Sequence, residues 1–289
     1  MRDLSWSVLD AGTLYGAILV ERIRSYDQRL LDLSDHSARL FRGARTLGID
    51  LSSTSFDMQS SANRLVSLNR DLVQQHGDVS LVLLLSPGEP SLRGGERKGP
   101  TLMMHLGPLP FAKLDQWYTH GVDLFLGSQQ VVPNDCWPSH IKSRSRLPYY
   151  LSDCLGAPQE ANSLAILTTA KGCLADTSVA NVLIVDGSGQ IISPKKEDIL
   201  IGCTLLALER LLLKRGVRIQ FQDILPDVLR EAKEVILTGS NGGVWFGRSF
   251  EGLPIGNGEL GEHAKRAIEI WKEYVAFDYV AQAAKYRPN

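Results

Sequence analysis

The sequence predicts a mixed α+β fold in two domains, and three observations support this prediction. The chain has 289 residues, which is enough for two modest domains. Its apolar fraction of 44% and charged fraction of 22% are those of an ordinary globular protein. Strand-like and helix-like segments follow one another with hairpins in both halves. Because they do not alternate as regular strand–helix–strand units, the order argues against a doubly wound nucleotide-binding fold.

Several classes of function are disfavoured by the composition. The 31 Lys and Arg residues balance 32 Asp and Glu residues, so neither nucleic acid nor an acidic membrane is an expected partner. No apolar run reaches the ~18 residues that a membrane helix needs. The apolar run 11–20 is expected as a buried strand rather than a signal core, since it continues directly into Glu21 and Arg22. These features predict a cytoplasmic protein.

The cysteines give no sign of a metal site. Four of them lie far apart in the sequence, at Cys136, Cys154, Cys173 and Cys203, without a C-x-x-C spacing. A zinc site or a disulfide framework is therefore not expected, and reduced thiols fit a cytoplasmic enzyme.

Elements of the first half follow from periodicity and turn residues. A hairpin is expected over residues 16–33, with a helix over 34–48 that Ser34 caps and Gly48 closes. A second helix is expected over 56–75. Strands at 80–86 and 100–107 then flank a Gly/Pro-rich loop, and residues 107–115 have the composition of a linker. We therefore predict a small N-terminal domain over 1–115 and a larger C-terminal domain over 116–289.

The second half is predicted to open with a strand at 121–131. Successive antiparallel strands follow, with a hairpin turn at 187–189, and an apolar helix is expected over 204–216. The segment 234–244 reads as a strand running into a Gly/Ser loop, and a terminal helix should begin near Glu262.

Residues that could carry chemistry occur in a definite order along the chain. Arg39 lies in "HSARL", Lys142 in "KSRSRL" and Asp176 in "LADTSVANV", and two further segments read "ILIGCT" at 199–204 and "LTGSN" at 237–241. A pyridoxal phosphate enzyme requires a lysine that forms a Schiff base and an acid that keeps the pyridine nitrogen protonated. It also requires an anion cradle of helix N-termini, hydroxyls and an arginine. The sequence offers a candidate for each.

In this order of motifs the chain resembles the class IV aminotransferase family, also called fold-type IV pyridoxal phosphate enzymes. The resemblance runs from "YGAILVERIRSYDQRL" to "GLPIGNGELGE", nearly the whole chain. It implies the two-domain fold of that family, pyridoxal 5′-phosphate as cofactor and no metal. It also implies amino acid and keto acid substrates and a homodimer in which neighbouring subunits border the active site between the domains.

Individual roles follow from the same resemblance. The Schiff-base lysine falls on Lys142, and Asp176 takes the place of the carboxylate that holds the pyridine nitrogen. The remaining matches are phosphate ligands, namely Arg39 on the first helix, Gly202, Cys203 and Thr204 in one loop, and Ser240 and Asn241 in a second. The middle group also has a physical argument, because small and hydroxyl residues that open a helix present free N–H groups to an anion.

Each assignment has a plainer alternative. Lys142 and Arg39 could be solvated surface charges, and Asp176 a turn residue. Ser240 and Asn241 could merely shape a loop. Tyr149 and Tyr150 fit core aromatics, and the sequence assigns them no role.

Two departures from the family pattern affect the expected activity. Asp176 stands where the family usually has a glutamate, one methylene longer. Pro87-Gly88 stands where several members have an Arg-Gly pair that can meet a substrate carboxylate, and Arg93, Arg144 or Arg146 could substitute for that arginine. The expected function is aminotransfer. "KSRSRL" also resembles the aminodeoxychorismate lyase version, which releases pyruvate, and a non-catalytic relative that binds the cofactor weakly or not at all is a third possibility.

Overall fold

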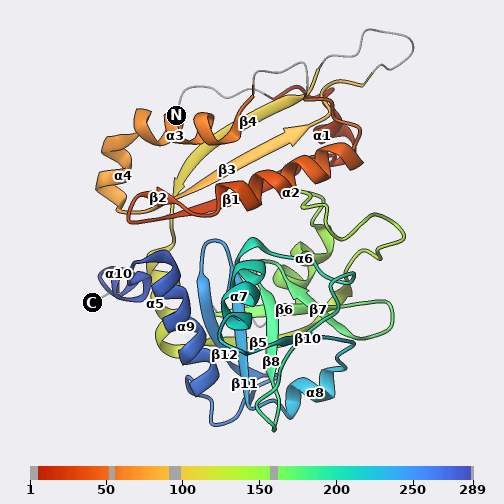
Figure 1. Ribbon diagram of the computed structural model, residues 1–289. Helices are drawn as coiled ribbons and strands as arrows, with labels where there is room; N and C mark the ends of the chain where they lie inside the picture. Colours follow the sequence, from red (N-terminus) through yellow and green to blue (C-terminus); the bar gives the residue numbers. More distant parts are fainter. Residues whose placement is uncertain (1–5, 52–55, 91–98, 157–161, 288–289) are drawn as a thin grey trace. The chain divides into compact units, whose positions relative to one another are not determined.

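A computed structural model describes residues 6–51, 56–90, 99–156 and 162–287, and the chain divides into two compact units (Figure 1). The first unit comprises residues 1–109 and 140–146, and the second comprises 110–139 and 147–289. Whereas the sequence predicts one boundary near residue 115, the chain first changes units after Leu109 and later returns for seven residues. Lys142, predicted in the C-terminal domain, lies in this returning segment.

The first unit is built on a four-stranded antiparallel sheet with the order β2-β1-β3-β4. Its helices and strands follow one another as α1 (Ala11–Tyr15), β1 (Leu19–Tyr26), β2 (Arg29–Leu30), α2 (Leu33–Thr46), α3 (Met58–Leu68), α4 (Arg70–His76), β3 (Val79–Ser86) and β4 (Thr101–Pro108). The predicted hairpin and both predicted strands are present.

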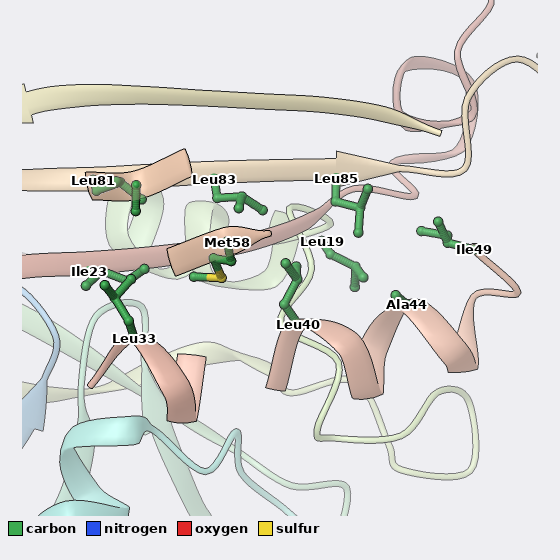
Figure 2. Close-up of a cluster of buried hydrophobic side chains, with 11 residues drawn as sticks. Leu19, Ile23, Leu33, Leu40, Ala44, Ile49, Met58, Leu81, Leu83 and Leu85 are labelled. Carbon is green, nitrogen blue, oxygen red and sulfur yellow. The ribbon is translucent and has the colours of Figure 1, made fainter. Parts of the chain in front are cut away.

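One face of this sheet carries the hydrophobic core of the first unit (Figure 2). Side chains alternate between the two faces of a strand, so Leu81, Leu83 and Leu85 of β3 all point to the same side. There they meet apolar residues of β1, α2 and α3, including Leu19, Ile23, Leu33, Leu40, Ala44, Ile49, Met58 and Ala62. The core therefore fixes α2 and α3 against the face to which the odd-numbered residues of β1 point.

Two sequence predictions in the first unit are wrong. Residues 11–15 form helix α1 rather than part of a strand, because the Asp10 carboxylate accepts the Gly12 N–H at 2.6 Å and Gly16 ends the helix with φ 67°. The helix predicted over 56–75 is two helices, which end and begin at Asn69. The loop residues 91–98, with Arg93, lie outside the described residues.

The second unit contains one large mixed sheet with the order β10-β9-β8-β11-β12-β5-β6-β7, and β13 pairs with β12. Its strands are β5 (Val122–Gln130), β6 (Ser163–Thr168), β7 (Leu174–Thr177), β8 (Asn181–Val185), β9 (Ile191–Ser193), β10 (Ile219–Phe221), β11 (Glu234–Gly239), β12 (Gly243–Phe250) and β13 (Leu253–Pro254). The β8–β9 hairpin and the β6–β7 pair are antiparallel, as predicted, whereas β5 pairs parallel to both β6 and β12.

Helices of the second unit are α5 (Phe111–His120), α6 (Leu147–Leu151), the π-helical turn Ser152–Gly156, α7 (Cys203–Leu213), α8 (Pro226–Arg230), α9 (Glu262–Val275) and α10 (Tyr279–Ala284). Two of them, α5 and α10, hold the start of β12, the strand that follows the second predicted phosphate loop. The Tyr118 hydroxyl of α5 donates to the Gly242 carbonyl at 2.8 Å, and the Tyr279 hydroxyl of α10 donates to the Val244 carbonyl at 2.8 Å. Trp117 stacks on Trp245 with ring centroids 4.9 Å apart. The start of β12 is thereby fixed.

Two further segments differ from what the sequence predicts. Residues 107–115, expected as a linker, contain the end of β4 and the first turn of α5, whose Phe111 and Leu114 are buried. The segment 243–250, expected to begin as a loop, is strand β12. The helices predicted over 204–216 and from residue 262 are present as α7 and α9. No helix among the described residues is long and apolar enough to cross a bilayer.

Candidate active site

Lys142 is held against an edge of the first unit's sheet by its own backbone. The Val20 N–H donates to the Lys142 carbonyl at 2.9 Å, and the Arg144 N–H donates to the Ile18 carbonyl at 2.8 Å. Leu19 and Ser143 form the antiparallel bridge between these two bonds. Lys142 is half-buried and directly precedes Ser143, the residue that forms this isolated bridge.

Arg39, the predicted phosphate arginine, lies in a buried ionic network on the helix-covered side of β1. The Glu21 carboxylate accepts hydrogen bonds from Arg39 Nε at 2.8 Å and Nη2 at 2.6 Å, and from His36 Nδ1 at 2.7 Å. Glu21 is 1% exposed and Arg39 is 7% exposed. Burial by itself would raise the pKa of the Glu21 carboxyl, but the charge and hydrogen bonds of Arg39, together with His36, lower it to about 2.

This network fixes the direction of the Arg39 guanidinium within the fold, because a fork-shaped donor pair on a carboxylate restricts its rotation. Glu21 was missed in the sequence prediction. Its one available signal was a single acid inside the apolar run "AILVERI", since a charge at a buried strand position requires a partner.

Asp176, the predicted partner of the pyridine nitrogen, is a buried carboxylate on β7 of the second unit. Its Oδ1 accepts the Tyr149 hydroxyl of α6 at 2.7 Å, and its Oδ2 accepts the Leu200 N–H at 3.4 Å. A carboxylate has about four lone-pair positions, so a further N–H donor can be accommodated. Tyr149, which has no role in the sequence prediction, thus orients the predicted catalytic acid.

Asn181 connects Asp176's strand to the first predicted phosphate loop. Thr177 and Ala180 close a tight turn through a hydrogen bond from the Ala180 N–H to the Thr177 hydroxyl at 2.8 Å, so β8 begins only four residues after β7 ends. At the start of β8, Asn181 Nδ2 donates to the Leu200 carbonyl at 2.8 Å and its Oδ1 accepts the Gly202 N–H at 3.1 Å. The Asn181 side chain therefore holds this phosphate loop at two points, Leu200 and Gly202.

The N-terminus of α7 follows this loop directly. Gly202 is the N-cap residue and provides no side-chain cap, so the first N–H groups of Cys203 and Thr204 lack an acceptor within the helix. A Cβ on Gly202 would lie 2.5 Å from Asn181 Oδ1, which explains why glycine is required there. This helix end, with the Thr204 hydroxyl beside it, can bind an anion.

The second predicted phosphate loop lies beside the first. Thr238, near the end of β11, pairs with Asn181 of β8, and residues 240–242 form the turn into β12. The buried Thr238 hydroxyl has no hydrogen-bond partner among the described residues. Ser240 and Asn241 in the turn are half-buried.

The described residues of the second unit fit a phosphorylated pyridine cofactor. The fit consists of a buried carboxylate for a protonated ring nitrogen, a helix N-terminus for a phosphate, and an orphaned buried hydroxyl that gains a partner when an oxygen-rich group binds. The predicted residues of this unit are thus brought together around Asn181. Lys142 and Arg39 belong to the first unit.

The chain is similar to known proteins over most of its length. The family described as amino-transferase class IV matches residues 18–250. The D-alanine aminotransferase of Bacillus licheniformis is 26% identical over 257 residues, which cover 89% of this chain and 87% of that protein.

Solved structures show the same fold. A T.th. branched-chain amino acid aminotransferase with pyridoxamine 5′-phosphate superimposes with a TM-score of 0.79 at 22% identity, covering 95% of this chain and 90% of that one. The 4-amino-4-deoxychorismate lyase of Pseudomonas aeruginosa gives a TM-score of 0.76 at 22% identity, with 96% and 97% covered. The predicted two-domain α+β fold is therefore confirmed.

Proposed function

The chain belongs to the class IV aminotransferase family, whose enzymes depend on pyridoxal 5′-phosphate, and on that premise we propose that it transfers the amino group of an amino acid or related amine to a keto acid by means of Lys142. The resemblance inferred from the sequence, the enzyme class and the cofactor are confirmed at the level of the family. Roles for individual residues are our proposal.

Each proposed role follows from the chemistry that the site supports. When bound, pyridoxal phosphate supplies an aldehyde for the amine and a protonated ring that withdraws electrons from the substrate α-carbon. Lys142 Nζ would hold that aldehyde and would also move the proton at the substrate α-carbon. The Asp176 carboxylate keeps the ring nitrogen protonated, and Tyr149 and the Leu200 N–H hold this shorter acid in place.

The remaining proposed roles concern the phosphate. Gly202, Cys203 and Thr204 present the N-terminus of α7, Ser240 and Asn241 present the neighbouring turn, and Arg39 supplies a cation. The single observation that supports the proposal best is that Asn181, at the start of the strand after Asp176's strand, holds the phosphate loop through two hydrogen bonds.

A spectrum with added cofactor tests this proposal. The purified protein with pyridoxal phosphate should show an absorbance band that borohydride treatment removes, and peptide mapping of the reduced protein should find the label on Lys142. Lys142→Ala should lack the band and the activity, whereas Lys171→Ala, at an exposed lysine, should keep both. A featureless spectrum of the wild-type protein would instead support a non-catalytic relative.

A lyase that releases pyruvate is the second candidate. It is favoured by "KSRSRL" and by the fold shared with the P. aeruginosa lyase, although a likeness at 22% identity bears on the fold alone. The two activities separate when the holoenzyme is given aminodeoxychorismate without a keto acid. Release of pyruvate under these conditions would contradict the aminotransferase proposal.

Assembly and location complete the proposal. We infer a cytoplasmic homodimer whose active site is bordered by the neighbouring subunit. Support comes from the family resemblance and from four cysteines that are all free, as in a reducing compartment. Sedimentation equilibrium of the holoenzyme tests the dimer, and a monomer at micromolar concentration would contradict it.

A further inference from the structure

Three arginines, Arg22, Arg144 and Arg146, lie close to one another in the part of the first unit that carries Lys142. Leu19 and Ser143 lie opposite one another, and Leu19 points into the core beneath α2. Because successive side chains of a strand alternate, Val20 and Arg22 of β1 point to the other face. Lys142 and Arg144 are the neighbours of Ser143 on either side, and their backbone bonds join them to Val20 and Ile18. Ile141, just before Lys142, packs against the core.

The antiparallel register fixes the order of these groups. Lys142 is placed opposite Val20 and Arg144 opposite Ile18 by the hydrogen bonds on either side of the Leu19–Ser143 bridge. Arg22 is two residues beyond Val20 on β1. Lys142 is therefore flanked along the sheet by Arg22 on one side and Arg144 on the other.

The charges in this cluster repel one another. Partial burial lowers the pKa of Arg22, and the nearby charge of Arg146 lowers it further. The pKa of Arg144 is lowered by the partial burial of its guanidinium and then by the charges of Arg22 and Arg146. Within the described part of the chain, neither Arg22 nor Arg144 forms an ion pair or a side-chain hydrogen bond with a carboxylate. Bringing an anion to this cluster offsets the repulsion.

The nearest acid on β1 cannot neutralise the cluster. Glu21 lies on the opposite face of the strand, where its carboxylate is occupied by Arg39 and His36. The sequence thus places an acid–base pair on the covered face and cations beside Lys142 on the other face. Within the described residues no acid pairs with Arg22 or Arg144, so an anion bound from outside can take that place.

We propose that Arg22 and Arg144 bind a carboxylate of the substrate and hold it beside Lys142, so that the substrate is a carboxylate-bearing amino acid rather than a simple amine. This inference deepens the proposed function and rests on it. It assigns to these two arginines the contact that Pro87, at the position of the Arg-Gly pair in several relatives, does not supply. A guanidinium is suited to this role because it remains charged and donates a planar pair of N–H groups to a carboxylate.

Calorimetric titration with glutarate tests the proposal without requiring turnover. Glutarate carries carboxylates but neither an amine nor a keto group, and glutaramide is its neutral analogue. The pyridoxal phosphate-loaded protein should bind glutarate saturably and glutaramide not at all. Arg144→Gln, at an exposed position, and Arg22→Gln should each raise the Kd for glutarate about tenfold.

Matched variants separate loss of the contact from loss of the fold. Arg29→Gln removes an exposed arginine on β2 of the same unit and should leave the Kd within about twofold. Since Arg22 is half-buried, Arg22→Lys is the second variant, and it should keep most of the affinity by retaining the charge.

The same proteins distinguish the possible failures. Equal Kd values for glutarate in wild type, Arg22→Gln and Arg144→Gln, or no saturable binding in wild type, would overturn the proposal. A fall in affinity for pyridoxal phosphate with glutarate binding unchanged would also overturn it, because the arginines would then hold the cofactor phosphate. If wild type shows no borohydride-sensitive band while the variants still lose glutarate binding, the anion site stands and the proposed function fails.

Discussion

Replacing the buried acid of the Glu21–His36–Arg39 network should destabilise the first unit by a predictable amount. Glu21→Gln keeps the shape of the side chain but removes the charge that Arg39 faces. A pKa lowered from 4.5 to about 2 in the folded state corresponds to about 3 kcal/mol of stability at neutral pH. This agrees with the roughly 3–5 kcal/mol expected when a buried ion pair loses one partner.

The effect should depend on pH in a defined direction. Because the folded-state pKa of Glu21 lies below its unfolded value, the stabilisation is fully present above about pH 5.5 and is lost as pH falls towards 2. The difference in unfolding free energy between wild type and Glu21→Gln should therefore shrink by about 1 kcal/mol between pH 7 and pH 4.

Hydrogen exchange of peptides from β1 and α2, together with urea unfolding, measures this difference locally and globally. Asp71→Asn, at an exposed carboxylate of α4 in the same unit, is the matched control and should change stability by less than about 0.5 kcal/mol. A Glu21→Gln protein as stable as wild type at pH 7, or a difference that grows as pH falls, would refute the reasoning.

Two further predictions concern the second unit. Tyr149→Phe removes the hydroxyl that donates to the buried Asp176 carboxylate, so the cofactor-free protein should lose about 1.5–3 kcal/mol in urea unfolding, and an unchanged midpoint would show that the hydrogen bond is not formed in solution. Gly239→Ala places a Cβ 2.4 Å from the Val179 carbonyl oxygen and should cost about 1–3 kcal/mol. Gly107→Ala, whose Cβ would meet nothing within 4 Å, should be close to wild type in thermal melting; equal melting points for the two variants would contradict the steric argument.

Elements with strong local signals could be predicted from the sequence. Helix α7 has an apolar stripe that ends in Lys214, Arg215 and Gly216, and its predicted range differs from the observed Cys203–Leu213 only at the ends. Strand β12 was not predicted, because its glycines suggest a loop and its stability comes from packing and hydrogen bonds with α5 and α10. Those contacts join residues more than thirty positions apart, which periodicity cannot detect.

The residues of the candidate site likewise fall into those that the sequence predicts and those that it does not. Asp176 and the loop ending at Thr204 are predicted as site residues because their order along the chain resembles a known family. Glu21 and Tyr149 could not, since each acts on a residue at a distance in sequence, 18 positions for Glu21–Arg39 and 27 for Tyr149–Asp176. A pattern identifies a residue type at a position, whereas a hydrogen bond of this kind exists only once the fold has brought both residues together.

The path of the chain through residues 140–146 limits how the protein can be rebuilt. The polypeptide leaves the first unit after Leu109, re-enters it for these seven residues, and leaves again before Leu147. A fragment that stopped at Leu109 would leave the edge of β1 at Leu19 unpaired and would lack the amine altogether. Replacing the first unit with that of a relative would therefore need more than one crossover point, because two separate segments of the chain build this unit. A working chimaera would have to carry residues 140–146 and the sheet that they contact together.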